Sequence, residues 1–275
     1  MSRPLIGLIP AAGQATRISP LPCSKELYPV GFRTDIRTGE LRPKVTSHYL
    51  LEQMRLAGIT STYVILRSGK WDIPAYLGDG AMLDMNLAYL IMRLPYGQPY
   101  TLDQAYPFVK DATVALGFPD IIFQADDAFG QLLARQAQTG AAVVLGLFRA
   151  NRPANSDMVD LSSDGRVRSI VVKPETTELT HTWILAVWAP TFTSFMHEHL
   201  ATKQAKRKDT SSRGAEDRTP ELFVGDVIQA AIEKNLRVEG LLFPKGNYLD
   251  IGTPDDLAKA CELAQGALTR ARHVN

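Results

Sequence analysis

The residues near the start of the chain have the composition of a loop that binds polyphosphate. A short apolar run, Leu5 to Ile9, is followed by the small residues 11–15, Ala-Ala-Gly-Gln-Ala. Small side chains let backbone N–H groups approach phosphate oxygens, and the two cations that follow, Arg17 and Lys25, offset phosphate charge. The loop lacks Gly-Lys-Ser/Thr and G-x-G-x-x-G, so it matches neither a Walker A motif nor a dinucleotide fingerprint. Taken alone, it could also be a plain strand-to-helix turn.

Two carboxylates and a third cation occur where further strands should end. Asp120 follows the apolar run at 112–116, Asp250 lies in Tyr-Leu-Asp-Ile-Gly-Thr-Pro, and Lys173 ends the strand expected at 167–172. Ligands of open parallel sheets bind at the carboxyl ends of the strands. Two aspartates can hold Mg²⁺, which prefers oxygen ligands and substrate phosphates. Each aspartate alone could form a turn or cap a helix, but together with three cations the set favours a site for a metal and phosphates.

Strand and helix signals alternate through the first half of the chain, which is typical of a largely parallel sheet flanked by helices. We expect one domain over residues 1–275, with a three-layer α/β/α core and antiparallel additions. Ser162 to Gly165 predicts a hairpin turn. Residues 202–219 contain no large apolar residue, so we expect a polar surface insertion or mobile loop there. Strands are expected at 62–66, 112–116, 141–148, 158–161, 167–172 and 182–188, and helices at 45–57, 127–138, 220–235 and from Pro254.

Composition excludes several classes of function. The formal net charge is +1, so no overall field draws the chain to nucleic acid or to a membrane. Cys23 and Cys261 are too few and too far apart for a disulfide framework or a zinc signature. No apolar run approaches the roughly 20 residues of a membrane span. We therefore expect a cytoplasmic protein with small-molecule partners.

The motifs, taken in order, resemble the sugar-1-phosphate nucleotidyltransferases, most closely the glucose-1-phosphate thymidylyltransferase branch. IPAAGQATRISPLP, SKELYPV and YLDIGTP are similar to the family's LAxGxGTRLxPxT, PKxLLPV or SKxLLP, and WxDxGTP. LLEQMRLAGITSTYVILRSG and GDGAMLDMNLAY also resemble family segments. The resemblance runs from about residue 4 to residue 262. It implies a Rossmann-like, GT-A-like nucleotidyltransferase fold.

The resemblance also implies a role for individual residues. Arg17 would contact the β- and γ-phosphates, Lys25 would bridge the nucleotide and the sugar phosphate, and Lys173 would lie near the sugar phosphate. Asp120 and Asp250 match the family's metal-binding aspartates. The nucleotide would be bound by Ala11, Ala12, Gly13, Gln14, Ala15 and Leu102. The implied partners are Mg²⁺, a nucleoside triphosphate (dTTP or UTP as the family default), a sugar-1-phosphate and further copies of the chain.

The chemistry implied is attack of a sugar-1-phosphate oxygen on the α-phosphorus of the nucleoside triphosphate, with loss of pyrophosphate. The nucleophile is already ionised at neutral pH, so no general base is needed. Positioning and charge stabilisation by Mg²⁺, Arg17, Lys25 and Lys173 would then carry the catalysis.

The chain departs from the family's pattern around the acceptor. Val172 stands where the family has a glutamate, Trp183 replaces a glycine, and Asp157 could supply a compensating carboxylate, so these three residues should decide which acceptor fits. The metal segment is two residues longer before Asp120, and Asp126 or Asp127 could compete for its role, although a helix N-terminus suits that pair better. Two alternatives therefore stay open. One is a non-catalytic homologue that binds nucleotides or sugar nucleotides. The other is a nucleotidyltransferase for a non-sugar phosphate or a phosphonate.

Overall fold

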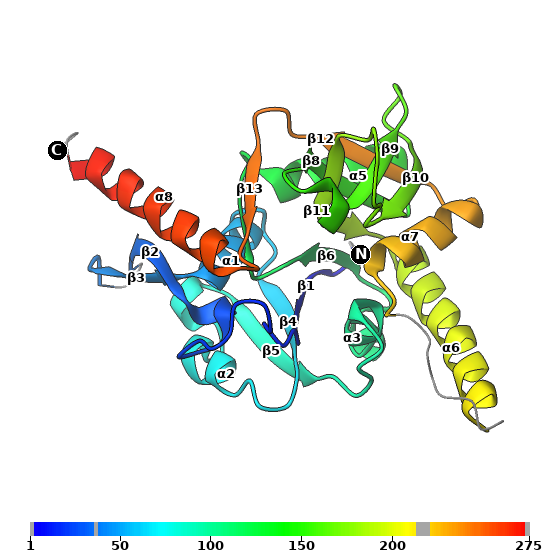
Figure 1. The fold of residues 1–275 in the computed structure, drawn as a ribbon, viewed down its shortest axis with the longest axis horizontal. Helices are drawn as coiled ribbons and strands as arrows, with labels where there is room; N and C mark the ends of the chain where they lie inside the picture. The colour runs from blue at the N-terminus through cyan, green and yellow to red at the C-terminus, as the bar shows by residue number, and fades with distance from the viewer. Residues whose placement is uncertain (1–2, 36–37, 213–220, 273–275) are drawn as a thin grey trace.

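A nine-stranded sheet forms the centre of the computed structural model, which describes residues 3–35, 38–212 and 221–272 (Figure 1). Four mutually parallel strands make up one half of it: β1 (Leu5–Ala11), β4 (Ser61–Leu66), β5 (Asn86–Ile91) and β6 (Thr113–Gly117). In the other half, β11 runs antiparallel to its neighbours β6, β8 and β9. At the edges, β12 runs parallel to β8, and β10 runs antiparallel to β9. These strands are β8 (Val143–Arg149), β9 (Asp157–Leu161), β10 (Val167–Val172), β11 (His181–Trp188) and β12 (Val238–Leu242).

Helices cover both faces of this sheet, so its central strands are apolar on both sides. Successive residues of β1 belong to different cores, with Leu8 on one face and Ile9 on the other, as the alternation of a strand requires. The core around Leu8 includes residues of α3 (Gln98–Asp103), α4 (Tyr106–Val109), α6 (Pro190–Ser212) and α7 (Val224–Glu233). The core around Ile9 includes residues of α1 (Thr46–Leu56), α2 (Asp72–Leu77) and α5 (Ala128–Thr139). The expected three-layer α/β arrangement is confirmed.

Two short antiparallel ladders lie outside the main sheet. β2 (Pro29–Thr34) pairs with β3 (Leu41–Val45), and β7 (Ile121–Gln124) pairs with β13 (Asn247–Asp250). The last helix, α8 (Pro254–Arg272), follows β13 and extends to the left in Figure 1. Short 3₁₀ turns occupy Lys25–Leu27, Ala81–Leu83 and Pro153–Asn155. The sequence pattern predicted none of these ladders.

The polar stretch at 202–219 differs from its prediction in the part that the structure describes. Residues 202–212 continue helix α6 and form no loop, while 213–219 lie outside the described residues. The first half of the helix contains Phe192, Met196 and Leu200, which are spaced four residues apart and are buried. Residues such as Ala, Lys and Gln, which follow, favour helix even where they bury nothing. The buried first half therefore starts a helix that the polar half can continue.

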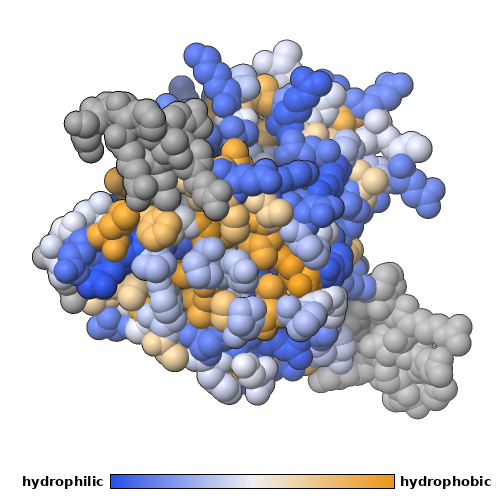
Figure 2. Space-filling view, turned by 60° about the vertical axis from the view of Figure 1, so that its left-hand side comes forward, coloured by the Kyte–Doolittle hydropathy of each residue, from blue (hydrophilic) through white to orange (hydrophobic). Residues whose placement is uncertain are grey.

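Hydrophobic side chains also reach the surface on the face shown in Figure 2. The large hydrophobic side chains that are exposed in the described residues are Phe32, Leu41, Leu56, Trp71, Tyr76, Ile91, Phe108, Val171, Leu242 and Leu263. The homo-oligomer that the resemblance implied stays a prediction. Within the described ranges, no helix combines the length and apolar character needed to cross a membrane.

Candidate functional site

One cavity of about 310 Å³ collects residues that are far apart in the sequence. Its walls include the end of β1 with the opening loop, the Lys25 turn, the start of β7, the N-terminal end of β9, and the start of β11. Eight of the residues predicted for the site line it: Gly13, Arg17, Lys25, Asp120, Asp157, Lys173, Trp183 and Asp250. The parallel strands β1 and β6 bring two of these segments to the same edge of the sheet.

The opening loop leaves its backbone accessible at Gly13. A Cβ placed on Gly13 would meet no atom of the described residues within 4 Å, so that side of the main chain is open at this position. The next cavity, of about 610 Å³, shares Gly13 and Gln98 with the first and is also lined by Ala12, Gln14 and Thr101. The loop thus lies between two adjoining cavities and lines both of them. A loop in this position could bind a phosphate chain on one side and a base on the other.

The two aspartates are brought together by the β7–β13 ladder. Asp250 pairs with Ile121, and the N–H of Ile251 donates to the backbone oxygen of Asp120 at 2.9 Å. Burial raises the pKa of Asp250 to about 6, and the negative charge of Asp120 adds to the rise, while Lys25 and Arg17 oppose it. Two carboxylates that lie close together, one of them buried, form a set of hard oxygen donors suited to a divalent cation.

No larger metal cluster supplements this pair. In the described ranges, no three His, Cys, Asp or Glu side chains gather where they could hold a metal ion. A cation bound by Asp120 and Asp250 would therefore need further oxygen ligands from phosphate groups or water, which is how Mg²⁺ is commonly held beside nucleotides.

Lys25 lies on a short 3₁₀ turn that is tied down on both sides. Ser24 donates from its backbone N–H and its hydroxyl to Asp72, at 2.6 and 2.8 Å. Lys70 donates to Glu26 at 2.6 Å, and the side chain of Glu26 is only 3% exposed. The segment 70–72 therefore holds the residues before and after Lys25. We call these contacts, made by Ser24, Glu26, Lys70 and Asp72, the Lys25 clamp.

The Lys25 ammonium points into the cavity and pairs with Asp120. Burial by itself would lower the pKa of Lys25, but the charge of Asp120 and their hydrogen bond, with smaller effects of Glu26 and Asp250, raise it above its usual value. The side chain therefore stays cationic at neutral pH and is available to an anionic ligand.

Arg17 connects the first cavity to a third one, of about 570 Å³. Arg152 and Lys259 also line this third space. Arg152 donates to the buried carboxylate of Asp256 through both terminal nitrogens, at 3.1 and 2.5 Å. Asp256 also accepts from the hydroxyl of Thr253, which in turn accepts from the backbone N–H of Asp256 and so caps α8. Arg152 and Asp256 are 104 residues apart in the sequence, so no local pattern indicates that they pair.

The far end of the cavity contains Asp157, Lys173 and Trp183. The ammonium of Lys173 lies 3.4 Å from the centre of the Phe223 ring. Lys173 has a φ of 43°, a strained conformation for a residue other than glycine, which is a feature common at binding sites. Burial raises the pKa of Asp157 to about 6; the charge of Lys173 opposes the rise and that of Asp226 adds to it.

Several predicted residues do not face these three cavities. Leu102 is 1% exposed and belongs to the hydrophobic core, whereas its neighbour Thr101 faces the second cavity. Val172 packs against the same core, and Ala11 is buried at the end of β1. Ala15 packs against a small cluster under α8 and has a φ of 55°. A role of Leu102 or Val172 in contacting ligand through the side chain is not supported by this placement.

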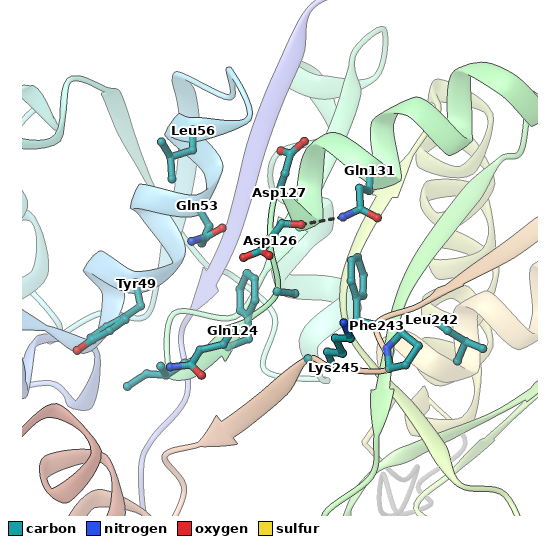
Figure 3. Close-up of a pocket in the computed structure, with 15 residues that line it drawn as sticks. Tyr49, Gln53, Leu56, Gln124, Asp126, Asp127, Gln131, Leu242, Phe243 and Lys245 are labelled. Carbon is teal, nitrogen blue, oxygen red and sulfur yellow. Dashed lines mark hydrogen bonds between the residues drawn. The ribbon is translucent and has the colours of Figure 1, made fainter. Parts of the chain in front are cut away.

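Asp126 and Asp127 lie at a different place from Asp120. They line a separate cavity of about 1060 Å³ between α1, α5 and the segment before β13 (Figure 3). Asp127 directly precedes α5, and Gln131 donates to the backbone oxygen of Asp126 at 2.7 Å. The expected helix N-terminus is confirmed, and Asp120 is the residue placed beside Asp250.

Sequence reasoning missed several residues of the site. Glu26, Gln98, Phe118 and Phe223 line the first cavity, yet the sequence analysis assigned a role to none of them, although Glu26 lies within the SKELYPV motif. Glu26 follows Lys25 directly, and its position beside a loop cation was the one available signal. His197 does not line this cavity, and its ring pairs with Asp103 at 3.0 Å.

Comparison with known proteins agrees with this geometry. The family model "Nucleotidyl transferase" matches residues 6–265. A glucose-1-phosphate thymidylyltransferase from Mycolicibacterium smegmatis is 27% identical over 271 residues, which covers 94% of this chain and 84% of that protein. A low-salt glycan biosynthesis nucleotidyltransferase from Haloferax volcanii is 23% identical, covering 94% of this chain and 65% of that protein.

Solved structures share the fold. A UDP-glucose pyrophosphorylase in complex with UDP-glucose has a TM-score of 0.73 at 15% identity, covering 96% of this chain and 99% of that one. The motif resemblance and the family model thus agree over nearly the whole chain. The chain belongs to the nucleotidyl transferase family.

Proposed function

We propose that this enzyme transfers a nucleotidyl group from a nucleoside triphosphate to a phosphorylated acceptor, a sugar-1-phosphate or a close analogue, with release of pyrophosphate. The observation that carries the proposal is the single cavity in which Gly13, Arg17, Lys25 and Lys173 face the carboxylates of Asp120 and Asp250. Family membership and relatives named as thymidylyltransferases support the same reaction.

The cations of the cavity have distinct places in this reaction. Lys25 lies between the aspartate pair and the loop, so it would bind the α-phosphate and the incoming acceptor phosphate. Arg17 faces the third cavity, so it would bind the β- and γ-phosphates and the pyrophosphate product. Lys173 lies at the acceptor end and would hold the acceptor phosphate. Fixed cations stabilise the charge that builds up on the phosphoryl oxygens, and the acceptor phosphate is already ionised and needs no base.

The aspartate pair fits a magnesium ion. Asp120 and Asp250 offer only oxygen donors, and the pKa of Asp250 is raised by burial and by the negative charge of Asp120, which a bound cation would offset. Mg²⁺ bound there would neutralise phosphate charge and hold the α-phosphate for attack. In its absence, repulsion from the two aspartates would weaken binding of the triphosphate.

The second cavity is proposed to take the base. It adjoins the opening loop, and the amide of Gln98 and the hydroxyl of Thr101 line it. An amide can both donate to and accept from the edge of a pyrimidine. A uracil or thymine base is therefore the first choice to test. A cytoplasmic location and a homo-oligomeric state remain parts of the proposal.

The test is a pyrophosphate-release assay with dTTP, UTP, CTP, ATP and GTP, each paired with a set of phosphorylated acceptors, with Mg²⁺ or with chelator. We expect turnover with at least one pair, loss of turnover with chelator, and loss in Lys25→Met. Lys110→Met, which removes an exposed lysine on the surface, is the matched control and should keep the wild-type rate. Absence of turnover with every pair, combined with sugar-nucleotide binding in calorimetry, would point instead to a non-catalytic binding homologue.

A further inference from the structure

The acceptor end of the first cavity contains a carboxylate that forms no ion pair with any cation whose side chain the structure describes. Asp157 begins β9 and lines the cavity together with Lys173 and Trp183. Among the side chains that the structure describes, those of residues 3–35, 38–205 and 221–264, Asp157 forms no ion pair within 4.0 Å. A carboxylate in a partly dehydrated cavity without an ion-pair partner is costly for the folded protein unless a ligand compensates it.

The nearest cation is held elsewhere. The Lys173 ammonium lies over the Phe223 ring, 3.4 Å from its centre, and forms no ion pair with Asp157, although its charge still lowers the pKa of that carboxyl. The backbone N–H of Lys173 donates to Ser156 at 3.1 Å, which fixes the residue in its left-handed conformation. Lys173 is thus free to bind a phosphate, and Asp157 is left for another part of the acceptor.

The absence of a side chain at Gly225 leaves room for the Asp157 carboxylate. The helix α7 approaches β9 at Gly225, and a Cβ on that residue would overlap the Asp157 carboxylate. The N–H of Gly225 and the indole N–H of Trp183 lie close enough to lower the pKa of Asp157, although burial dominates and the net pKa is raised. The Trp183 N–H has no hydrogen bond of normal geometry. The carboxylate is therefore positioned by its surroundings but incompletely compensated by them.

The walls around Asp157 are aromatic and anionic. Trp183 is 6% exposed, and its ring centre lies 5.7 Å from that of Phe118. Glu221 also lines the cavity, and the charge of Asp226 raises the pKa of Asp157 further. Carboxylates and aromatic faces both attract cations. A polyhydroxylated ligand would instead need hydrogen-bond donors from the protein for the lone pairs of its hydroxyl groups. Among the residues that line this end of the cavity, Lys173 is the one cationic donor, and it is needed for the acceptor phosphate.

We infer that the preferred acceptor phosphate carries an ammonium group, which pairs with Asp157 beside the rings of Phe118 and Trp183. This inference rests on the proposed function and specifies its acceptor. An amino sugar phosphate and an amino-alcohol phosphate share the chemistry. Either would place its phosphate at Lys173 and its ammonium at Asp157, so that these two side chains each meet an opposite charge.

The test compares acceptors that differ in one group. Glucose-1-phosphate, glucosamine-1-phosphate and N-acetylglucosamine-1-phosphate carry a hydroxyl, an ammonium and a neutral amide at the same carbon, and 2-aminoethyl phosphate is compared with ethyl phosphate. We expect kcat/KM to be at least tenfold higher for the ammonium compound than for its neutral partners in one of the two series. The series that shows the preference identifies the source of the amine. Equal or better turnover of the neutral compounds in both series would overturn the inference and leave the proposed function intact.

Variants then assign the preference to Asp157. Asp157→Asn keeps the shape and one acceptor oxygen but removes the charge and turns the other oxygen into an NH2 donor, so the preference should fall at least fivefold. Asp160→Asn, on the same strand and remote from the cavity, is the matched control and should retain the full preference. An unchanged preference in Asp157→Asn would refute the assignment. Absence of turnover with all five acceptors would refute the proposed function; calorimetric affinities of wild type and Asp157→Asn for glucosamine-1-phosphate would then decide the inference, and equal affinities would overturn it.

Discussion

Replacement of Lys70 by methionine tests the Lys25 clamp. The change keeps a long apolar stem and removes the ammonium that pairs with Glu26 at 2.6 Å. The side chains of Lys70 and Glu26 are 11% and 3% exposed, so water cannot take the place of the lost partner. One oxygen of Glu26 already has no hydrogen-bond partner, which makes Lys70 its main compensation.

The magnitude follows from this burial. Removing one partner of a buried ion pair leaves an uncompensated charge and costs about 3 to 5 kcal/mol of the free energy of unfolding. The double variant Glu26→Gln, Lys70→Met has no charge to compensate, so it should recover most of that loss. Lys44→Met breaks a pair with Glu52 whose side chains are 15% and 26% exposed, and the corresponding loss should be about 1 kcal/mol.

Urea unfolding followed by tryptophan fluorescence measures these differences, and it should be repeated across pH. Without Lys70, burial holds the pKa of Glu26 above its usual value of 4.5. A carboxylate with a raised folded pKa destabilises the protein progressively as pH rises through that range, because only the charged form is penalised. The deficit of Lys70→Met should therefore be largest at pH 8 and shrink toward pH 5.

Two results would refute the reasoning. If the double variant is as unstable as Lys70→Met, the loss comes from packing of the lysine stem and not from the stranded carboxylate. If the deficit of Lys70→Met is the same at pH 5 and pH 8, Glu26 does not become an unpaired charge in the variant.

Three further predictions follow from the site and the core. Asp250→Asn should lower the rate of pyrophosphate release at least a hundredfold, about 2.7 kcal/mol of transition-state stabilisation, with little change in the unfolding midpoint; near-normal activity would exclude Asp250 from the site. The buried His48 has its pKa lowered to about 3 by burial, with Arg33 and Lys44 adding to the effect. The stability gained by burying the neutral imidazole is therefore fully present above the usual pKa of 6.5 and is lost as pH falls toward 3. Wild type should therefore lose about 2 kcal/mol relative to His48→Leu between pH 6.5 and pH 5, measured by urea unfolding, and parallel pH profiles would contradict this. Gly225→Ala should displace the Asp157 carboxylate, cost about 1 to 3 kcal/mol in urea unfolding and change the relative kcat/KM of acceptors, and unchanged acceptor selectivity would show that Asp157 does not contact them.

Local patterns predicted the layers of the fold and most residues of the first cavity. Apolar runs such as 112–116 and 182–188 become buried strands because helices cover both faces of the sheet. Asp120 could be placed beside Asp250 because residues that follow strands tend to gather at one edge. The ladder that joins the two aspartates was not predicted, since four-residue strands carry too little pattern.

Other features depend on contacts between distant residues. Leu102 and Thr101 are adjacent, yet one faces the core and the other a cavity, and a family motif does not specify which side chain faces the ligand. Lys70 and Glu26 are separated by 44 residues, so neither position indicated its partner. Residues 202–212 were expected to form a loop because they are polar, but a helix anchored by its first turns needs no apolar face farther along.

The ladder between β7 and β13 has a consequence for how the protein acquires activity. It joins positions about 130 residues apart, and closing a chain segment of that length costs about 4 kcal/mol of entropy before any contact repays it. Such long-range pairing forms slowly compared with the local contacts of β1, α1 and β4. During synthesis the sheet can assemble around β1 and β6 while Asp250 is still within the ribosome. Catalytic competence should therefore appear later than folded structure, as a separate and slower phase of maturation.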